Sequence, residues 1–415
     1  MKFLFIATCA PRPLNPTKGI FVQQMANALV LQGHEVDILV PVRVFPTKEL
    51  KSCIVRPSRW AKFPGALRKW TREWVHTSSE VTLEGVHYIY KRFVTLPRVS
   101  NSGMDCALFA ESSRTWLASR FPAGGYSFVL GHFAETIPLV LHMSRQQSCS
   151  SGVYIHEDIQ DYCRIVNRDY LRDNLAKCDF IFTNSYRSQS QLRAVTAACG
   201  QIDVVHLGID EIFRRNQSRG DVAPAKEVKL VCVARFTERK NQLLLLEALS
   251  LLKSTRQDFN LHLTLVGDDS LYRHQLARQV KDLNLEPSVR FTDATNLDVI
   301  CKALQQADIF IFPSKFESFG VVVIEAASQG LPIISSTEIG AVKELELSGF
   351  SLSTFDPRSA GGLATSIELM LENYKEHLAA AQVIRDFVIL EYSWENTALE
   401  IVNAIRGKLN ELKSA

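Results

Sequence analysis

Short apolar runs and amphipathic stretches alternate along most of the chain. Lys2–Ala7 is an apolar run typical of a buried parallel strand, and Ile20–Leu31 has the periodicity of a helix. Gly33 supplies a helix stop, and residues 35–41 form the next apolar run. This strand–helix–strand order predicts the βαβ unit of a parallel sheet. We expect the same sheet to continue through strands at residues 126–130, 152–155, 180–183 and 204–207.

A second alternation of the same kind follows a polar segment. Residues 214–226 read RRNQSRGDVAPAK, a composition typical of a linker. Two doubly wound halves joined by a linker place a ligand cleft at the carboxyl ends of their strands. We therefore predict an α/β protein with two Rossmann-like domains facing each other across a cleft. The second half is expected to contain strands at residues 228–234, 261–267, 289–291, 308–312 and 331–335, with helices from Gln242, near 272–285 and up to Gly330.

Length, composition and charge narrow the class of protein. A chain of 415 residues is too long for one core, and a hydrophobic content of 46% with 22% charged residues is that of an ordinary globular protein. A net charge of +3 gives no argument for a nucleic-acid partner. The cysteines are scattered, odd in number and never spaced C-x-x-C, which favours free thiols in a reduced compartment and disfavours a zinc site.

The amino-terminal apolar run ends before Pro11. It is too short for a signal peptide, and no uncharged apolar run approaches the ~20 residues that a membrane span needs. We therefore expect a protein of the cytoplasm that is neither exported by a visible signal nor integral to a membrane.

The common phosphate-binding motifs are missing. No G-x-G-x-x-G follows the first strand, and no G-x-x-x-x-G-K-[ST] occurs, which argues against a dinucleotide fingerprint and a P-loop. No D-x-D occurs either, so a common way of holding a metal on a diphosphate is absent. An anionic ligand is then expected to meet helix N-termini and cationic side chains, with no metal.

Arg235 and Lys240 lie in the loop after the strand that ends at Ala234. Both can lie above the carboxyl edge of the sheet, beside a helix N-terminus. A bidentate arginine fork and a lysine point charge suit a diphosphate. The alternative interpretation is a charged loop in solvent.

Residues 313–332 (PSKFESFGVVVIEAASQGLP) carry the second candidate group. Ser318 can cap a helix whose first amides belong to Phe319, Gly320 and Val321, and the helix dipole there favours an anion. Glu325, two turns on, is an acid among apolar residues. An ionised carboxylate only accepts hydrogen bonds, so it suits the paired hydroxyls of a ribose or a sugar ring; the alternative is an acid that reaches solvent.

The pair Glu317 and Glu325 resembles the paired-glutamate signature of the retaining glycosyltransferases of family 4, which have the GT-B fold. The resemblance leaves out about residues 42–125. Four positions where the family often has glycine hold Asn241, Asp269, Asp293 and Ala341, which leaves the nucleotide and the sugar open. The further matching segments are 18–21, 33–36, 208–210 with Phe213, Arg235 with Lys240, 266–268, 313–314, 330–332, Gly340 with Glu344, and 392–395.

The resemblance implies roles for the candidate donor site. Arg235 and Lys240 would hold the donor diphosphate, and Glu325 the ribose hydroxyls. Glu317 would hold hydroxyls of the transferred sugar, which makes Glu317, Arg235 and Lys240 catalytic candidates. The remaining donor-binding candidates are Gly19, through close approach of the first loop, and the backbone of Phe319, Gly320 and Val321.

Two histidines are candidates in the first domain. His132, in GHFAE, is a further catalytic candidate, because it matches a family histidine near the anomeric carbon. His156, in YIHED, lies at the end of the next predicted strand and is the second candidate, with Asp158 beside it on the acceptor side. A structural role for either histidine stays open.

The resemblance also implies a domain plan and a reaction. Residues 1–213 would bind the acceptor, 214–226 would link, 227–392 would bind the nucleotide sugar, and 393–415 would form a helix that crosses back. The reaction would be metal-independent, retaining transfer from a UDP- or GDP-linked sugar to a glycan or lipid-linked acceptor in polysaccharide or cell-envelope synthesis, with no further cofactor. A GT-B epimerase or hydrolase, and a non-catalytic binding module for nucleotide sugars or membranes, are the alternatives.

Residues 51–75 carry seven Lys and Arg against one Glu, with three tryptophans among them. Pro64 can begin a helix there. The sequence predicts either a peripheral helix on the cytoplasmic face of an anionic membrane or an aromatic face packed on its own domain. The apolar face would hold Phe63, Leu67, Trp70 and Trp74, and the charges elsewhere on the helix would be Arg68, Lys69 and Arg72.

Overall fold

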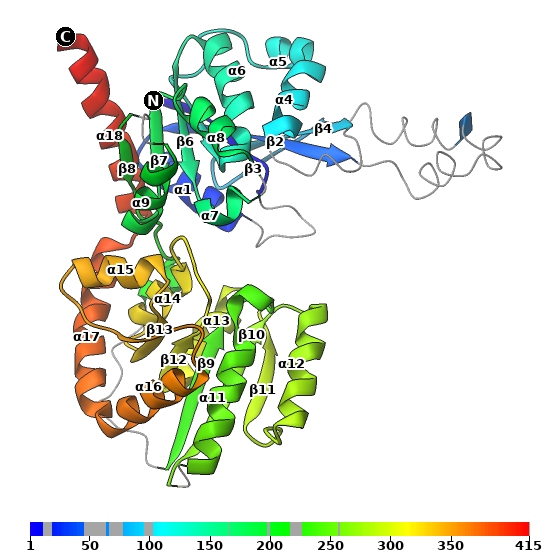
Figure 1. Ribbon diagram of the computed structural model, residues 1–415. Helices are drawn as coiled ribbons and strands as arrows, with labels where there is room; N and C mark the ends of the chain where they lie inside the picture. The colour runs from blue at the N-terminus through cyan, green and yellow to red at the C-terminus, as the bar shows by residue number, and fades with distance from the viewer. Residues whose placement is uncertain are drawn as a thin grey trace. The chain divides into compact units, whose positions relative to one another are not determined.

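The computed structural model describes residues 1–10, 19–44, 64–65, 78–94, 103–164, 166–196, 200–215, 226–255 and 258–414. The chain divides into two compact units, each with one sheet and helices on its faces (Figure 1). Unit 1 contains Met1–Asn184, Gln189–Val205 and Thr397–Ala415, and unit 2 contains Ser185–Ser188 and His206–Asn396. The predicted α/β class with two doubly wound sheets is confirmed.

Unit 1 is built on an eight-stranded sheet in the order β3-β4-β2-β1-β5-β6-β7-β8. Neighbouring strands are parallel except β3 and β4, which form an antiparallel hairpin at one edge. Its turn is formed by Glu84 and Gly85, both at positive φ, as a tight hairpin turn requires. The strands are β1 (Lys2–Ala7), β2 (Glu35–Val44), β3 (Ser78–Leu83), β4 (Val86–Val94), β5 (Phe128–His132), β6 (Ser150–Ile155), β7 (Phe180–Thr183) and β8 (Ile202–Val204).

Alternate residues of β1 show how the sheet of unit 1 is covered on both faces. Leu4 and Ile6 belong to a buried cluster with the helices α4 and α6, while the rings of Phe3 and Phe5 point the other way. Lys408 of α18, the red helix of Figure 1, lies over the Phe180 ring of β7. The helices lying wholly or mostly in this unit are α1 (Ile20–Leu31), α4 (Gly103–Ser112), α5 (Arg114–Arg120), η2 (Ala134–Thr136), α6 (Ile137–Gln147), α7 (Ile159–Tyr162), α8 (Arg168–Leu175), α9 (Tyr186–Val195) and α18 (Trp394–Ser414).

Unit 2 holds a six-stranded, fully parallel sheet in the order β11-β10-β9-β12-β13-β14. Its strands are β9 (Glu227–Val233), β10 (Asn260–Gly267), β11 (Val289–Asp293), β12 (Ile309–Phe312), β13 (Ile333–Ser336) and β14 (Ser353–Phe355). Its helices are α10 (Glu211–Arg214), η3 (Glu238–Lys240), α11 (Gln242–Thr255), α12 (Leu271–Asp282), α13 (Leu297–Gln306), α14 (Val321–Ser328), α15 (Gly340–Leu347), α16 (Ala360–Glu372) and α17 (Tyr374–Glu391).

The helices α11, α12 and α16 pack on one face of this sheet (Figure 1). Leu230, Leu263 and Val289 from β9, β10 and β11 face them in one buried cluster. The residues between these positions point to the opposite face, because successive strand side chains alternate. The order of the strands also places the loops after β9 and β12 side by side, since these strands are neighbours.

Several predictions fall outside the described residues. Among the membrane-surface candidates this holds for Phe63, Leu67, Arg68, Lys69, Trp70, Arg72 and Trp74, and in the same segment only Pro64 and Gly65 are described. Most of the predicted linker 214–226 is also outside. The compact units change over between Val205 and His206, upstream of the predicted limit at residue 213, and the predicted domain plan stays a prediction.

Neither a membrane span nor a metal site is found among the described residues. None of their helices is long and apolar enough to cross a bilayer. None of their His, Cys, Asp and Glu side chains form a group of three or more that could ligate a metal ion.

Candidate active site

Lys240 and Glu317 form the centre of a charged cluster in unit 2. Lys240 ends η3 after β9, and Glu317 lies in the loop between β12 and α14. The Lys240 Nζ atom lies 2.5 Å from Glu317 Oε1. The same oxygen accepts a hydrogen bond of 2.8 Å from Ser314 Oγ and lies 3.0 Å from Arg239 Nη1. Burial lowers the pKa of Lys240, and the Glu317 carboxylate opposes that shift. The structure therefore brings together two of the predicted donor-site residues.

Arg239 is a member of this cluster that the sequence reasoning missed. Its guanidinium contacts Glu317, donates a 3.2 Å hydrogen bond to the Phe316 carbonyl and lies 5.5 Å from the centre of the Phe316 ring. The sequence could have indicated Arg239 by its position next to Lys240, because both cations lie in the same short helix, η3. The cluster thus presents two cations to one carboxylate.

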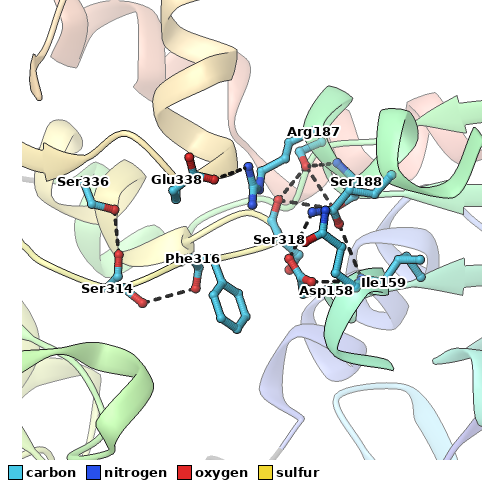
Figure 2. Close-up of polar contacts among 12 residues, drawn as sticks. Asp158, Ile159, Arg187, Ser188, Ser314, Phe316, Ser318, Ser336 and Glu338 are labelled. Carbon is cyan, nitrogen blue, oxygen red and sulfur yellow. Dashed lines mark hydrogen bonds and ion pairs between the residues drawn. The ribbon is translucent and has the colours of Figure 1, made fainter. Parts of the chain in front are cut away.

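The loop that carries Glu317 is fixed by two buried serines at the carboxyl ends of β12 and β13. Figure 2 shows Ser336 donating to the Ser314 carbonyl, at 2.6 Å, and the Ser314 hydroxyl lying 3.2 Å from the Phe316 carbonyl oxygen. The Glu317 amide donates to the Glu338 carbonyl at 3.0 Å. These bonds hold the carboxylate in one position before any ligand arrives, which is the preorganisation that a binding site needs.

Arg235 lies in the same loop as Lys240 and takes a different direction. Its side chain is 79% exposed, and its Nε lies 3.4 Å from Oδ2 of Asp268. Asp268 also accepts a 2.7 Å hydrogen bond from the Phe236 amide. The guanidinium is therefore anchored at one edge and open to solvent, while the Lys240 side chain is only 14% exposed beside Glu317.

The N-terminus of α14 differs from the prediction in one respect. Gly320 is the N-cap residue, with φ of 89°, and no side chain caps the helix, so the prediction that Ser318 caps it is wrong. The chain turns instead so that the Ser318 carbonyl accepts hydrogen bonds from Ser185 and Ser188, at 2.5 and 3.3 Å. A Cβ on Gly320 would lie 2.8 Å from Ile339 Cγ2, so this turn requires glycine.

Phe319 and Val321, the two other predicted backbone contacts, flank Gly320. Phe319 is buried and its carbonyl accepts a 2.7 Å hydrogen bond from the Ala341 amide, whereas Val321 is the first residue of α14. Both amides therefore lie at the positive end of a helix dipole, next to the Glu317 loop.

Glu325 lies on the second turn of α14, between the buried Ile324 and Ala326. Burial, together with the smaller effect of the nearby Asp210, raises the pKa of its carboxyl group to about 7. The acid is thus half-buried in an environment that disfavours its charge, and its role in binding stays a prediction.

This raised pKa gives a pH-dependent prediction. The folded protein keeps the Glu325 proton up to about pH 7, whereas the unfolded chain releases it near 4.5, so its stabilising contribution is present below pH 4.5 and is lost as the pH rises through 7. We expect the free energy of unfolding of Glu325→Gln, relative to the parent, to increase by about 3 kcal/mol between pH 4.5 and 8. Denaturant titrations at several pH values measure this difference, and parallel pH profiles would contradict it.

His132 and His156, the two candidates in unit 1, contact each other. His132 ends β5, and His156 follows β6. The Nδ1 of His132 lies 3.1 Å from Nε2 of His156, at hydrogen-bonding distance, and the two rings are stacked. Burial lowers the pKa of His132 to about 3 and that of His156 well below its usual value. Both imidazoles are therefore neutral at physiological pH, and His156 is the more exposed of the two.

The two residues after His156 have structural hydrogen bonds. Glu157 accepts from the amides of Ala134 and His156, at 2.8 and 3.0 Å, and burial raises its pKa to about 7. Asp158 caps α7 by accepting from the Gln160 and Asp161 amides. The Asp158 carboxylate therefore already serves as a helix cap. Its predicted place on the acceptor side stays a prediction.

Gly19 is the N-cap of α1, with φ of 71°. A Cβ there would lie 2.2 Å from the Cys9 carbonyl oxygen, so the start of the first helix can pass the end of β1 only with glycine at this position. This is a local packing reason for the glycine that the sequence interpretation had linked to close approach of a phosphate.

A polar network in unit 1 was missed by the sequence reasoning. Arg43, at the end of β2, lies 2.9 Å from Asp105 and 3.5 Å from Glu135, and Thr8 after β1 donates to Glu135. These side chains come from separate segments that follow or end neighbouring strands. No local spacing in the sequence signals such a group, because each of these segments contributes only one residue to it.

The chain is similar to known glycosyltransferases in sequence and in fold. Residues 213–386 match the family model of glycosyl transferases group 1. The D-inositol 3-phosphate glycosyltransferase of Nocardioides sp. is 24% identical over 78% of this chain and 76% of its own length. A GDP-mannose-dependent alpha-(1-6)-phosphatidylinositol monomannoside mannosyltransferase of Mycobacterium tuberculosis is 24% identical over 54% of this chain and 61% of its own.

Solved structures show the same fold. Sucrose-phosphate synthase of Thermosynechococcus elongatus superposes with a TM-score of 0.71 at 18% identity, covering 99% of this chain and 100% of its own. Anabaena HepE in complex with UDP and glucose gives a TM-score of 0.69 at 16% identity, covering 98% and 100%. The chain is a glycosyltransferase of the GT-B fold. The residues that match the group 1 model, 213–386, include the whole Lys240–Glu317 cluster and α14.

Proposed function

We propose that this glycosyltransferase moves a sugar from a UDP- or GDP-linked donor to a hydroxyl group of a glycan or lipid-linked acceptor. The transfer proceeds with retention and without a metal ion, in the synthesis of a polysaccharide or cell-envelope glycan. The observation that carries the proposal is the cluster of Lys240, Arg239 and Glu317 at the carboxyl ends of β9 and β12, with Arg235 open to solvent in the same loop.

The charges of this cluster suit a diphosphate. Lys240 and Arg239 together bring two positive charges to the single negative charge of Glu317. A donor diphosphate can therefore take over contacts with the cations, which leaves Glu317 to accept hydrogen bonds from sugar hydroxyls. Charge-assisted hydrogen bonds of this kind are short and roughly twice as strong as neutral ones.

The same cations support the chemical step. In the proposed step the bond from the anomeric carbon to the diphosphate oxygen breaks, and the acceptor oxygen bonds to the same face of that carbon. The acceptor proton passes to the departing phosphate oxygen. Negative charge builds up on the diphosphate, where Arg235 and Lys240 stabilise it. No protein nucleophile is needed.

Two features bear on the donor. Glu325 lies in α14, the helix that Gly320 precedes. It is proposed to accept hydrogen bonds from the ribose hydroxyls once it is ionised. The similar M. tuberculosis enzyme is named as GDP-mannose-dependent, and the similar HepE was solved with UDP. We therefore restrict the proposed donors to UDP- and GDP-sugars.

A panel of UDP- and GDP-sugars tests the proposal. We expect at least one of them to raise the melting temperature, because a ligand that binds only the folded state stabilises it, and to be consumed when a glycan or lipid-linked acceptor is added. Transfer should continue at an unchanged rate in EDTA. Turnover that stops in EDTA and returns with Mg²⁺ or Mn²⁺ would contradict metal independence, and an epimerised or hydrolysed donor without transfer would contradict the transferase reaction.

We also propose that residues 51–75 hold the enzyme peripherally on the cytoplasmic face of an anionic membrane. The support is the sequence alone, with its cations and tryptophans. We expect the parent protein to bind vesicles containing anionic lipid and to leave them as salt rises, because salt screens Arg68, Lys69 and Arg72. Replacing Trp70 and Trp74 with serine should abolish binding and leave the melting temperature unchanged. A melting temperature lower by several degrees, with no vesicle binding by the parent, would instead indicate that the aromatic face packs on the protein.

A further inference from the structure

Part of the second face of the sheet in unit 2, next to α13, is polar. Lys229 in β9, His262 in β10 and Arg290 in β11 point to this face, opposite the buried Leu230, Leu263 and Val289. The parallel register places Lys229 beside His262 and Arg290 beside Thr264. Side chains of neighbouring strands in register lie about 5 Å apart, so these residues form one continuous patch.

A groove of about 770 Å³ runs between this patch and α13. Lys302 of α13 lines it together with Thr264 and Thr292 of the strands. The volume lies within the range of small-molecule sites, which is roughly 300–1,000 Å³. The wall is rich in hydrogen-bond donors, because it combines lysine, arginine, histidine and threonine side chains.

The cations of this groove lack ion-pair partners in the part of the chain that the structure describes. Among the described residues, the side chains of Lys229, Arg290 and Lys302 form no ion pair or hydrogen bond, and Glu227 is the one acid that lines the groove. Many other cations of unit 2 are paired. Examples are Arg273 with Asp293, Lys315 with Glu238, Lys343 with Glu346, and Arg358 with Asp356.

We propose that this groove binds a small phosphorylated molecule of the size of a sugar phosphate. Lys229, Arg290 and Lys302 contact the phosphate oxygens, and the hydroxyls of Thr264 and Thr292 donate to the remaining oxygens of the ligand. A fork of guanidinium donors with lysine point charges is the usual protein partner of a phosphate group.

This site is separate from the proposed donor site. Lys229 is near the start of β9, whereas Arg235 follows its end. Six residues of extended strand span roughly 20 Å, so one small molecule cannot occupy both places. The proposal therefore goes beyond sugar transfer, and its failure would leave the donor site unaffected.

Binding of glucose 6-phosphate and of inorganic phosphate to the full-length protein tests the site, with glucose as the uncharged control. We expect calorimetry at low salt to show binding of both phosphates and none of glucose. The double variant Lys229→Ala with Arg290→Ala should bind glucose 6-phosphate at least tenfold more weakly. Arg235→Ala should retain the parent affinity, and so should the matched control Arg278→Ala, an exposed arginine on α12 at the opposite face of the sheet.

Three results would overturn the proposal. One is an unchanged affinity in the double variant, and another is the same loss in Arg278→Ala. The third is no binding of either phosphate to the parent at millimolar concentration. A loss confined to Arg235→Ala would assign the phosphate to the donor site instead. All four replaced side chains are exposed or paired only at the surface, so melting temperatures close to that of the parent are expected throughout.

Discussion

Lys240→Ala is expected to lower kcat/KM for the donor by about 100- to 1,000-fold, because it removes a buried cation from the place where the leaving diphosphate gains charge. Lys240 is held 2.5 Å from Glu317, so little reorganisation is needed when the donor replaces that contact. Most of the loss should fall on kcat, since the lost interaction is stronger in the transition state than in the ground state. Steady-state kinetics with the best donor from the panel measures both constants.

Lys315→Ala is the matched control for this variant. Lys315 lies in the loop before Glu317 and pairs with Glu238 at 3.0 Å on the surface. Its replacement should change kcat/KM by less than about threefold, because exposed ion pairs contribute little. The fold should survive Lys240→Ala, since Glu317 keeps its contacts with Arg239 and Ser314. Activity of Lys240→Ala close to that of the control would remove Lys240 from the donor site.

Gly340→Ala is expected to destabilise the protein by about 3 kcal/mol, the upper part of the usual range for overpacking. A Cβ on Gly340 would lie 2.1 Å from the Ser318 carbonyl oxygen and 3.0 Å from the Phe319 Cα. These are backbone atoms, so the loop before α14 would have to shift. The melting temperature should fall by roughly 6–12 °C, and donor affinity should fall with it.

Gly361→Ala gives the opposite expectation with the same chemical change. Gly361 lies in α16, and a Cβ there would meet nothing within 4 Å. Alanine in a helix is favoured over glycine by about 0.5–1 kcal/mol, so this variant should be slightly more stable than the parent. If both glycine variants have the stability of the parent, the loop before α14 is not packed against α15 as described.

The sequence predicted those parts of the fold that depend on local patterns. The bounds of β1, α1, β7 and the start of α11 agree with the apolar periodicity. Other predicted strands are displaced along the chain, as at β8, where a short run leaves the strand ends weakly defined. The hairpin of β3 and β4 lies in the segment for which no strand was predicted.

The contacts of the candidate site could be predicted only in part. Lys240 and Glu317 were both singled out, but their ion pair joins residues 77 positions apart and depends on the order of the strands. The same reason explains why Arg239 was overlooked, since its role follows from where Glu317 lies. The wrong cap at Ser318 shows a different limit. A serine before a helix has the correct local chemistry, yet the tertiary contacts of its carbonyl decided the path of the backbone.

The edges of the two sheets have a consequence for solubility during folding. The edge strands β8 and β14 are each three residues long, which gives a second chain little backbone to pair with. The edge strands β3 and β11 carry charged residues that pair with neighbours, Glu80 with Arg120 and Asp293 with Arg273. Short or charged edges discourage strand-to-strand association between molecules. Large, mostly parallel sheets form slowly, and these edges protect the chain from aggregation at the positions where it is most exposed to it.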